Sequence, residues 1–105
     1  MSVVDVNVVD GCALDKNGCL ILMISDHLDW DDEYQHLITL QAKINAYIAF
    51  CESGQYLNIY PNEEIRYALI EIHCEYSPTK NAIAFLNQVQ EQVGELGVKI
   101  ECHAP

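Results

Sequence analysis

The residues with the most obvious chemistry lie together at positions 25–33, which read Ser-Asp-His-Leu-Asp-Trp-Asp-Asp-Glu. This stretch holds five carboxylates, one of the four histidines and the only tryptophan, and no Lys or Arg occurs from position 17 to position 42. Carboxylates beside a histidine could bind a divalent cation. They could also serve as the acid–base pair of a small hydrolase or isomerase that uses Asp26, His27 and Asp29.

The surrounding motifs argue against both chemistries. The spacing differs from the Asp-x-Asp-x-Asp-Gly of a calcium loop, and neither a nucleophile nor a Gly-rich phosphate loop accompanies it. The sequence therefore predicts no catalytic residue, no metal ion and no cofactor. Two interpretations remain, a solvated helix cap and a partner-binding surface made of Asp26, His27, Asp29, Trp30, Asp31, Asp32 and Glu33. Trp30 is expected to cover the helix–sheet edge.

Size and charge set the broad class. A chain of 105 residues, half of them hydrophobic, predicts a single domain over residues 1–105 with one core. Its 16 acidic and 5 basic residues give a formal charge of −11. Such a surface repels nucleic acid and anionic membranes and attracts basic proteins or cations, so we expect no nucleic-acid and no membrane partner.

The cellular location is predicted to be the cytoplasm. The first residues show no basic segment followed by an apolar one, and no apolar run approaches the length of a membrane span. The five cysteines are odd in number and scattered, without a Cys-x-x-Cys motif, which favours reduced thiols over a disulfide framework.

Turn and strand signals open the chain. Asn17-Gly18 lies between two apolar runs and predicts a hairpin with a type I′ turn, in which Lys16 pairs with Cys19 and Cys12 lies opposite Met23. Strict alternation predicts a third strand over residues 65–76, and residues 98–103 form a short last strand.

Two amphipathic helices separate these strands. The first has an apolar stripe at Leu37, Leu40, Ile44, Tyr47, Ile48 and Cys51, with Asp29 or Asp31 as its cap and Gly54 as its stop. The second is predicted to start with Ser77 as N-cap and Pro78 at the first helical position. The order β-β-α-β-α-β, with parallel third and fourth strands, predicts an α+β fold, a two-layer sandwich of a single sheet with two helices on one face.

The exposed face of this sheet is a second candidate surface. It is expected to show an apolar patch with an acidic rim: Ile21, Met23, Tyr67, Leu69, Glu71, His73, Glu75, Lys99, Glu101 and His103. A homodimer contact is the alternative use of this face. His73-Cys74 and Cys102-His103 could be neighbours, but alternation directs each Cys to the core and each His outward, which argues against a zinc site there.

The chain also resembles a known group of proteins. Its distinguishing segments are Ser25-Asp26-His27-Leu28-Asp29-Trp30, Gln41-x-Lys43-Ile44-Asn45-x-Tyr47, Glu52-Ser53-Gly54 and Tyr76-Ser77-Pro78. With these segments the chain is similar, over nearly its whole length, to a family of small bacterial proteins of unknown function. The resemblance implies a bacterial origin and this order of elements, and it implies no mechanism.

The leading hypothesis is a non-enzymatic, acidic binding protein, in its most specific form a bacterial immunity protein or antitoxin that neutralises a basic toxin such as a nuclease. The alternatives are the hydrolase or isomerase named above and a homo-oligomeric accessory domain. A pocket containing His27 with two carboxylates would favour the enzyme, and an exposed acidic ridge without a pocket would favour the binding protein.

Overall fold

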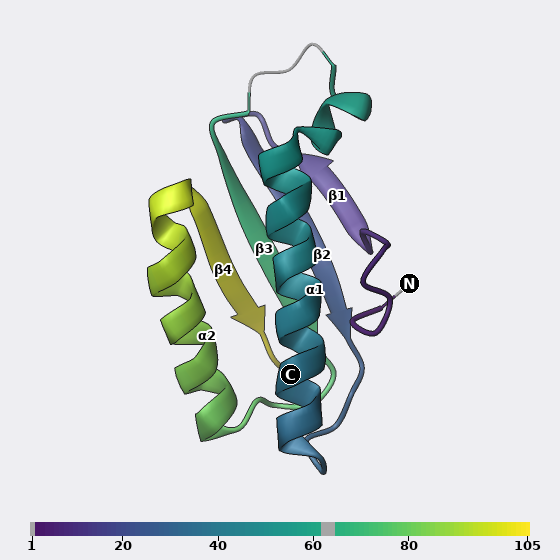
Figure 1. Ribbon diagram of the computed structural model, residues 1–105, viewed down its shortest axis with the longest axis vertical. Helices are drawn as coiled ribbons and strands as arrows, with labels where there is room; N and C mark the ends of the chain where they lie inside the picture. Colours follow the sequence, from purple (N-terminus) through teal and green to yellow (C-terminus); the bar gives the residue numbers. More distant parts are fainter. Residues whose placement is uncertain (1, 62–64) are drawn as a thin grey trace.

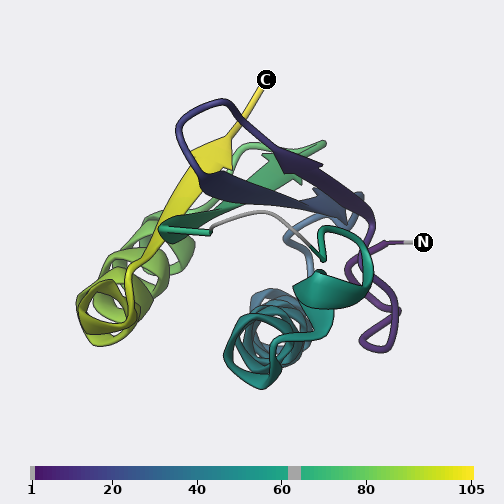
Figure 2. The same cartoon turned by 90° about the horizontal axis from the view of Figure 1, so that it is seen from above.

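A computed structural model describes residues 2–61 and 65–105 of the chain, and its elements form two layers (Figure 1). The strands are β1 (Gly11–Leu14), β2 (Cys19–Asp26), β3 (Tyr67–Cys74) and β4 (Val98–His103), and the helices are α1 (Glu33–Ser53) and α2 (Lys80–Val93). Short 3-10 helices follow α1 at Gln55–Asn58 and α2 at Gly94–Leu96. Figure 2 shows both helices on one face of the sheet, so the predicted α+β fold class is confirmed.

The sheet has the strand order β1-β2-β3-β4. β1 pairs antiparallel with β2, while β2, β3 and β4 run parallel, as predicted for the last two strands. Each parallel connection passes through a helix on the same face, as parallel crossovers require. The carboxyl ends of β2, β3 and β4 therefore meet at one edge of the sheet, and α1 begins just beyond it.

Alternation along the central strands builds the core. Leu20, Leu22 and Ile24 of β2 are fully buried beneath the helices, and so are Ile70 and Ile72 of β3. The helices supply the opposite half of the core with Leu40, Ile44 and Tyr47 from α1 and Ala82, Leu86 and Val93 from α2. The period-2 pattern of the strands and the helical stripes thus predicted the core correctly.

The hairpin forms where it was predicted, but the type of turn was wrong. β1 and β2 pair with Leu14 opposite Leu20 and Cys12 opposite Leu22, one residue away from the expected register. The loop has three residues, because the Asp15 N–H donates to the Cys19 carbonyl at 3.0 Å. Asp15 Oδ1 accepts the N–H groups of Asn17 and Cys19, and within the loop only Gly18 has a positive φ, 83°. The side chain of Asp15 thereby favours a longer loop than Asn-Gly alone indicates.

Gly18→Val tests this turn. The left-handed conformation at Gly18 costs a residue with a Cβ about 1–2 kcal/mol, and more if it is β-branched, so the free energy of unfolding is expected to fall by at least about 1 kcal/mol. Asn17→Ala is the matched control and is expected to have a much smaller effect, because Asn17 does not adopt a positive φ. Urea denaturation of both variants measures the difference, and equal stability of the two would contradict the turn geometry.

The caps of both helices differ from those predicted. Asp32 is the N-cap of α1 and accepts the N–H of Gln35 at 3.2 Å, whereas Asp29 accepts the N–H of Asp31 in the preceding turn. Thr79, not Ser77, caps α2 and accepts the N–H of Ala82. Several Asp, Ser and Thr residues compete at each start, and sequence pattern does not rank them. The predicted stop at Gly54 is confirmed, with φ 76°.

A buried lysine ties α1 to the first residues of the chain. The side chain of Lys43 is fully buried, and its ammonium donates to the carbonyls of Asp5 and Val8 and to Asp10 Oδ1. One turn along, the hydroxyl of Tyr47 donates to the Met23 carbonyl and accepts the N–H of Asp10. These bonds satisfy every polar group that the helix carries into the core at this point.

Candidate functional site

The stretch predicted to carry function connects the end of β2 to the start of α1, and a buried carboxylate lies at its beginning. Asp26 is 1 % exposed, and its two oxygens lie 2.8 and 2.7 Å from Nε2 of His36. His36 belongs to the first turn of α1 and is 3 % exposed. The Asp26–His36 pair therefore joins the last residue of the strand directly to the helix.

The rest of this connection closes over the pair. Nδ1 of His36 lies 2.8 Å from the carbonyl oxygen of Asp29. The indole of Trp30 stacks on the imidazole, with ring centroids 3.6 Å apart and planes at 19°, and its Nε1–H donates to the Tyr76 carbonyl at 3.4 Å. Trp30 thus covers the edge between helix and sheet, as expected from the sequence.

These hydrogen bonds limit what His36 can do chemically. A carbonyl oxygen only accepts, so Nδ1 of His36 carries a hydrogen that points at Asp29. Nε2 faces a carboxylate and shares a proton with Asp26. Neither ring nitrogen is left to take a proton from a substrate, and Trp30 blocks one face of the ring. The pair therefore acts as a structural element, although its residue types are those of a catalytic dyad.

The structure separates the seven predicted site residues into three groups by their exposure. Asp26 was wrongly placed on the partner-binding surface, because β-alternation directs it into the core beside Leu22 and Ile24. Trp30 and Glu33 are half-buried, and the Glu33 carboxylate accepts a hydrogen bond from the Asn81 side chain at 2.8 Å. The four others are exposed: His27, Asp29, Asp31 and Asp32.

A shallow hollow of about 350 Å³ lies beside this connection. Its lining includes His27, Asp29 and Asp32, with Gln35, His36 and Thr39 from α1. Asp29 and Asp32 each already accept a backbone N–H, so both carboxylates are partly engaged in shaping the loop and the helix start. His27 is the exposed histidine of this hollow.

Sequence reasoning missed His36 as a part of the site, although a signal was present. His36 precedes Leu40 by four residues and continues the stripe that leads to Lys43, Ile44 and Tyr47. A polar side chain on the buried stripe of a helix needs a partner in the core. The nearest acidic residue on the buried face of the preceding strand is Asp26, so the pair could have been proposed from alternation alone.

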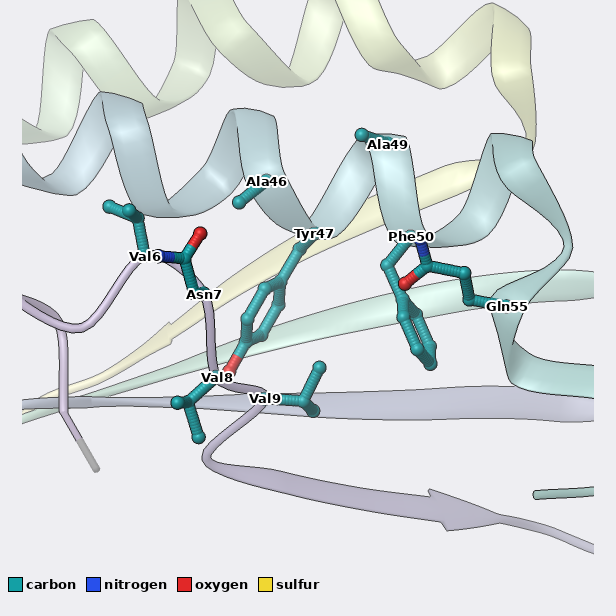
Figure 3. A pocket seen from close by; sticks show the side chains of 9 residues that line it. All are labelled: Val6, Asn7, Val8, Val9, Ala46, Tyr47, Ala49, Phe50 and Gln55. Carbon is teal, nitrogen blue, oxygen red and sulfur yellow. The ribbon is translucent and has the colours of Figure 1, made fainter. Parts of the chain in front are cut away.

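A second hollow, also about 350 Å³, lies between the first residues of the chain and α1 (Figure 3). Figure 3 shows Tyr47 and Phe50 pointing from the helix toward the segment with Val8 and Val9. Its lining has no charged side chain, and the Tyr47 hydroxyl is already bound at both ends. Val9 and Phe50 at its edge pack against the core, so the hollow marks where the first residues of the chain meet α1.

The cysteines near the ends of β3 and β4 are in contact. Sγ of Cys74 lies 3.3 Å from Sγ of Cys102, on the core side of the sheet, and both thiols are free. Burial, followed by the neighbouring Cys102, raises the pKa of Cys74, and burial raises the pKa of Cys51 to about 11. Thiolates, the form that binds metal and attacks disulfides, are therefore disfavoured at Cys74 and Cys51.

Substitutions in the Asp26–His36 pair test its structural role. His36→Leu removes the imidazole partner of the buried Asp26 carboxylate and leaves it only the Leu28 N–H, so the free energy of unfolding is expected to fall by about 3–5 kcal/mol. Asp26→Asn retains an acceptor for His36 and is expected to cost less, about 1–2 kcal/mol. His27→Ala, at the exposed neighbouring histidine, is the control and should change stability by less than about 0.5 kcal/mol. Urea denaturation gives the three values, and equal losses for His36→Leu and His27→Ala would refute the role.

Within residues 2–61 and 65–105, no helix combines the length and the apolar character needed to cross a bilayer.

Comparisons with known proteins add the family to this picture. A search of curated proteins and a search of solved structures each found no match. A family model described as "Family of unknown function" matches residues 1–105, which agrees with the resemblance seen in the sequence. The chain therefore belongs to the family of unknown function DUF6572.

Proposed function

We propose that the protein is a non-enzymatic binding protein whose partner is a basic protein, and that residues 27–33 form the contact. The observation that carries the proposal is a set of exposed carboxylates on a rigidly held loop. Asp29, Asp31 and Asp32 are exposed, and no Lys, Arg or His of the described residues forms an ion pair with them. The Asp26–His36 pair fixes the loop before any partner arrives, which reduces the entropy lost on binding.

Helix capping explains only part of this charge. Asp32 is the N-cap of α1 and accepts the N–H of Gln35, and Asp29 accepts the N–H of Asp31 in the preceding turn. The carboxylate of Asp31 takes part in neither of these two hydrogen bonds. Like charges this close repel and lower the stability of the fold, although the positive end of α1 offsets some of the repulsion. A cationic surface would convert the remaining repulsion into attraction and would accelerate association.

The more specific form of the proposal is a cytoplasmic bacterial immunity protein or antitoxin that neutralises a basic toxin such as a nuclease. Its support is the size of the domain and the formal charge of −11. A homo-oligomeric accessory domain is the alternative within the same class, in which the exposed sheet face, with Met23 40 % and Tyr67 46 % exposed, would pair with a second copy.

The association of wild type with its partner is expected to slow steeply as salt rises. The partner is first isolated on immobilised protein from cells that carry the gene and is identified by mass spectrometry. Asp31→Lys with Asp32→Ser, which retains a capping side chain, should then lower the association rate constant by about tenfold or more at low salt. The melting temperature should change little.

Glu91→Lys with Glu95→Gln is the matched control. It changes the net charge by the same three units on an exposed part of the chain remote from the loop. If both double variants and wild type associate at the same rate, and salt has no effect, then residues 27–33 are only a helix cap. If the association rate depends on salt and both double variants reduce this dependence equally, the attraction for the partner comes from the overall charge and not from residues 27–33.

A small hydrolase or isomerase remains a second candidate, because the hollow contains His27 with the two carboxylates of Asp29 and Asp32. A histidine beside two carboxylates in a pocket is the arrangement expected of an acid–base enzyme. Chromogenic carboxylic and phosphoric esters test it directly. Turnover by wild type that disappears in His27→Ala and persists in His73→Ala would establish the enzyme and displace the binding proposal.

A further inference from the structure

Four polar side chains form a square on the sheet face opposite the helices. In the parallel pairing of β3 with β4, Glu71 lies opposite Glu101 and His73 lies opposite His103. Residues two apart in a strand point to the same side, so all four project away from the core. Figure 2 shows that neither helix covers this side of the sheet.

The side chains of the square already converge. Glu71, Glu101 and His103 each offer one ligand atom, and these atoms lie within 4.8 Å of one another. Nε2 of His103 is 3.3 Å from Glu101 Oε1 and 4.0 Å from Glu71 Oε2. His73 completes the square, since its Nε2 is 3.2 Å from Glu71 Oε1 and its ring lies parallel to that of His103, with centroids 5.0 Å apart.

The electrostatics of this arrangement favour a cation. Two carboxylates directly opposite each other on neighbouring strands repel and destabilise the pairing. Lys99 lies 3.4 Å from Glu101 but is 68 % exposed, so water screens most of its effect. The side chain of Glu71 is only 22 % exposed, which makes its charge the more costly of the two to leave without a close counter-charge.

We propose that Glu71, Glu101 and His103 form a binding site for a late first-row divalent metal ion, with Zn²⁺ as the typical occupant. One imidazole and two carboxylates form a nitrogen–oxygen ligand set that suits Zn²⁺ and its neighbours in the series. Ligands about 2.0–2.2 Å from a tetrahedral ion lie roughly 3.4 Å from each other, so the observed separations require only small side-chain rotations. The fourth position faces solvent.

The adjacent thiols are the main competing explanation for any zinc that the protein binds. Cys74 and Cys102 lie on the opposite side of the same two strands, with their sulfur atoms 3.3 Å apart. The experiment must therefore distinguish the two faces of the sheet. The proposal does not depend on the binding function assigned to residues 27–33, and it departs from the expectation that the chain binds no metal.

The test is calorimetric titration of ZnCl₂ into reduced, chelator-treated protein. Wild type is expected to bind one ion per chain. Glu71→Gln with Glu101→Gln should weaken binding by at least about tenfold, since even residues that only support metal ligands contribute on the order of 10–100-fold. His103→Ala should do the same. Glu91→Gln with Glu95→Gln, which lowers the negative charge equally on exposed helical and 3-10 positions, should bind as wild type does.

A variant without the two thiols separates the alternatives. Cys74→Ala with Cys102→Ala should retain zinc binding, and Co²⁺-loaded wild type should lack the charge-transfer absorption that thiolate ligands give. Circular dichroism checks that each variant is folded. The proposal is overturned if wild type binds no zinc, if the cysteine variant alone loses it, or if the Glu71/Glu101 and Glu91/Glu95 variants are weakened alike.

Discussion

A buried carboxylate at the end of β2 is the constraint on which the functional surface depends. Asp26 would cost several kcal/mol in the core without a partner, and the partner it finds is ten residues later, in α1. The pair therefore fixes where the helix starts relative to the strand, and residues 27–32 must span that distance. The Asp29 carbonyl and the Trp30 indole complete the enclosure of His36. The buried Asp26–His36 pair therefore holds the exposed acidic residues of this connection in place.

A second buried charge acts farther along the same helix. Lys43 binds two carbonyls of the first residues and Asp10, and Asp10 in turn accepts the N–H of Ser25 beside the end of β2. A purely apolar stripe would fix the position of α1 through side-chain packing alone. With His36 and Lys43 on that stripe, a shift of the helix by one turn would leave two buried charged groups without partners. The fully buried residues of α2 are all apolar, and its polar tie to the sheet is the half-buried Gln90, which donates to the Val98 carbonyl and accepts the N–H of Ile100 in β4.

Pattern in the sequence was sufficient for the fold class, because alternation and helical periodicity report on burial directly, but it did not predict the parallel pairing of β2 with β3. It placed the core, the hairpin and the side of the sheet that His73 and His103 occupy. It did not rank competing caps, and it paired Lys16 with Cys19, because it did not include the side chain of Asp15 that sets the loop. The burial of Asp26, His36 and Lys43 was not predicted, because polar residues were assumed to lie on the surface. Glu71 and Glu101 were expected on the exposed sheet face, but their pairing was not predicted, because the two residues are 30 positions apart and meet only through strand register.

The acidic loop and the Glu–His square share the edge of the sheet where β2, β3 and β4 end. A shallow hollow there is lined by Ser25 and His27 on one side and by His73 and His103 on the other. Ligand sites of parallel sheets gather at carboxyl ends because loops and helix termini meet there. A divalent ion in the square would offset two of the eleven net negative charges close to the loop. Occupancy of the square would therefore weaken the attraction of residues 27–33 for a basic partner, and it would do so most at low salt, where screening is least.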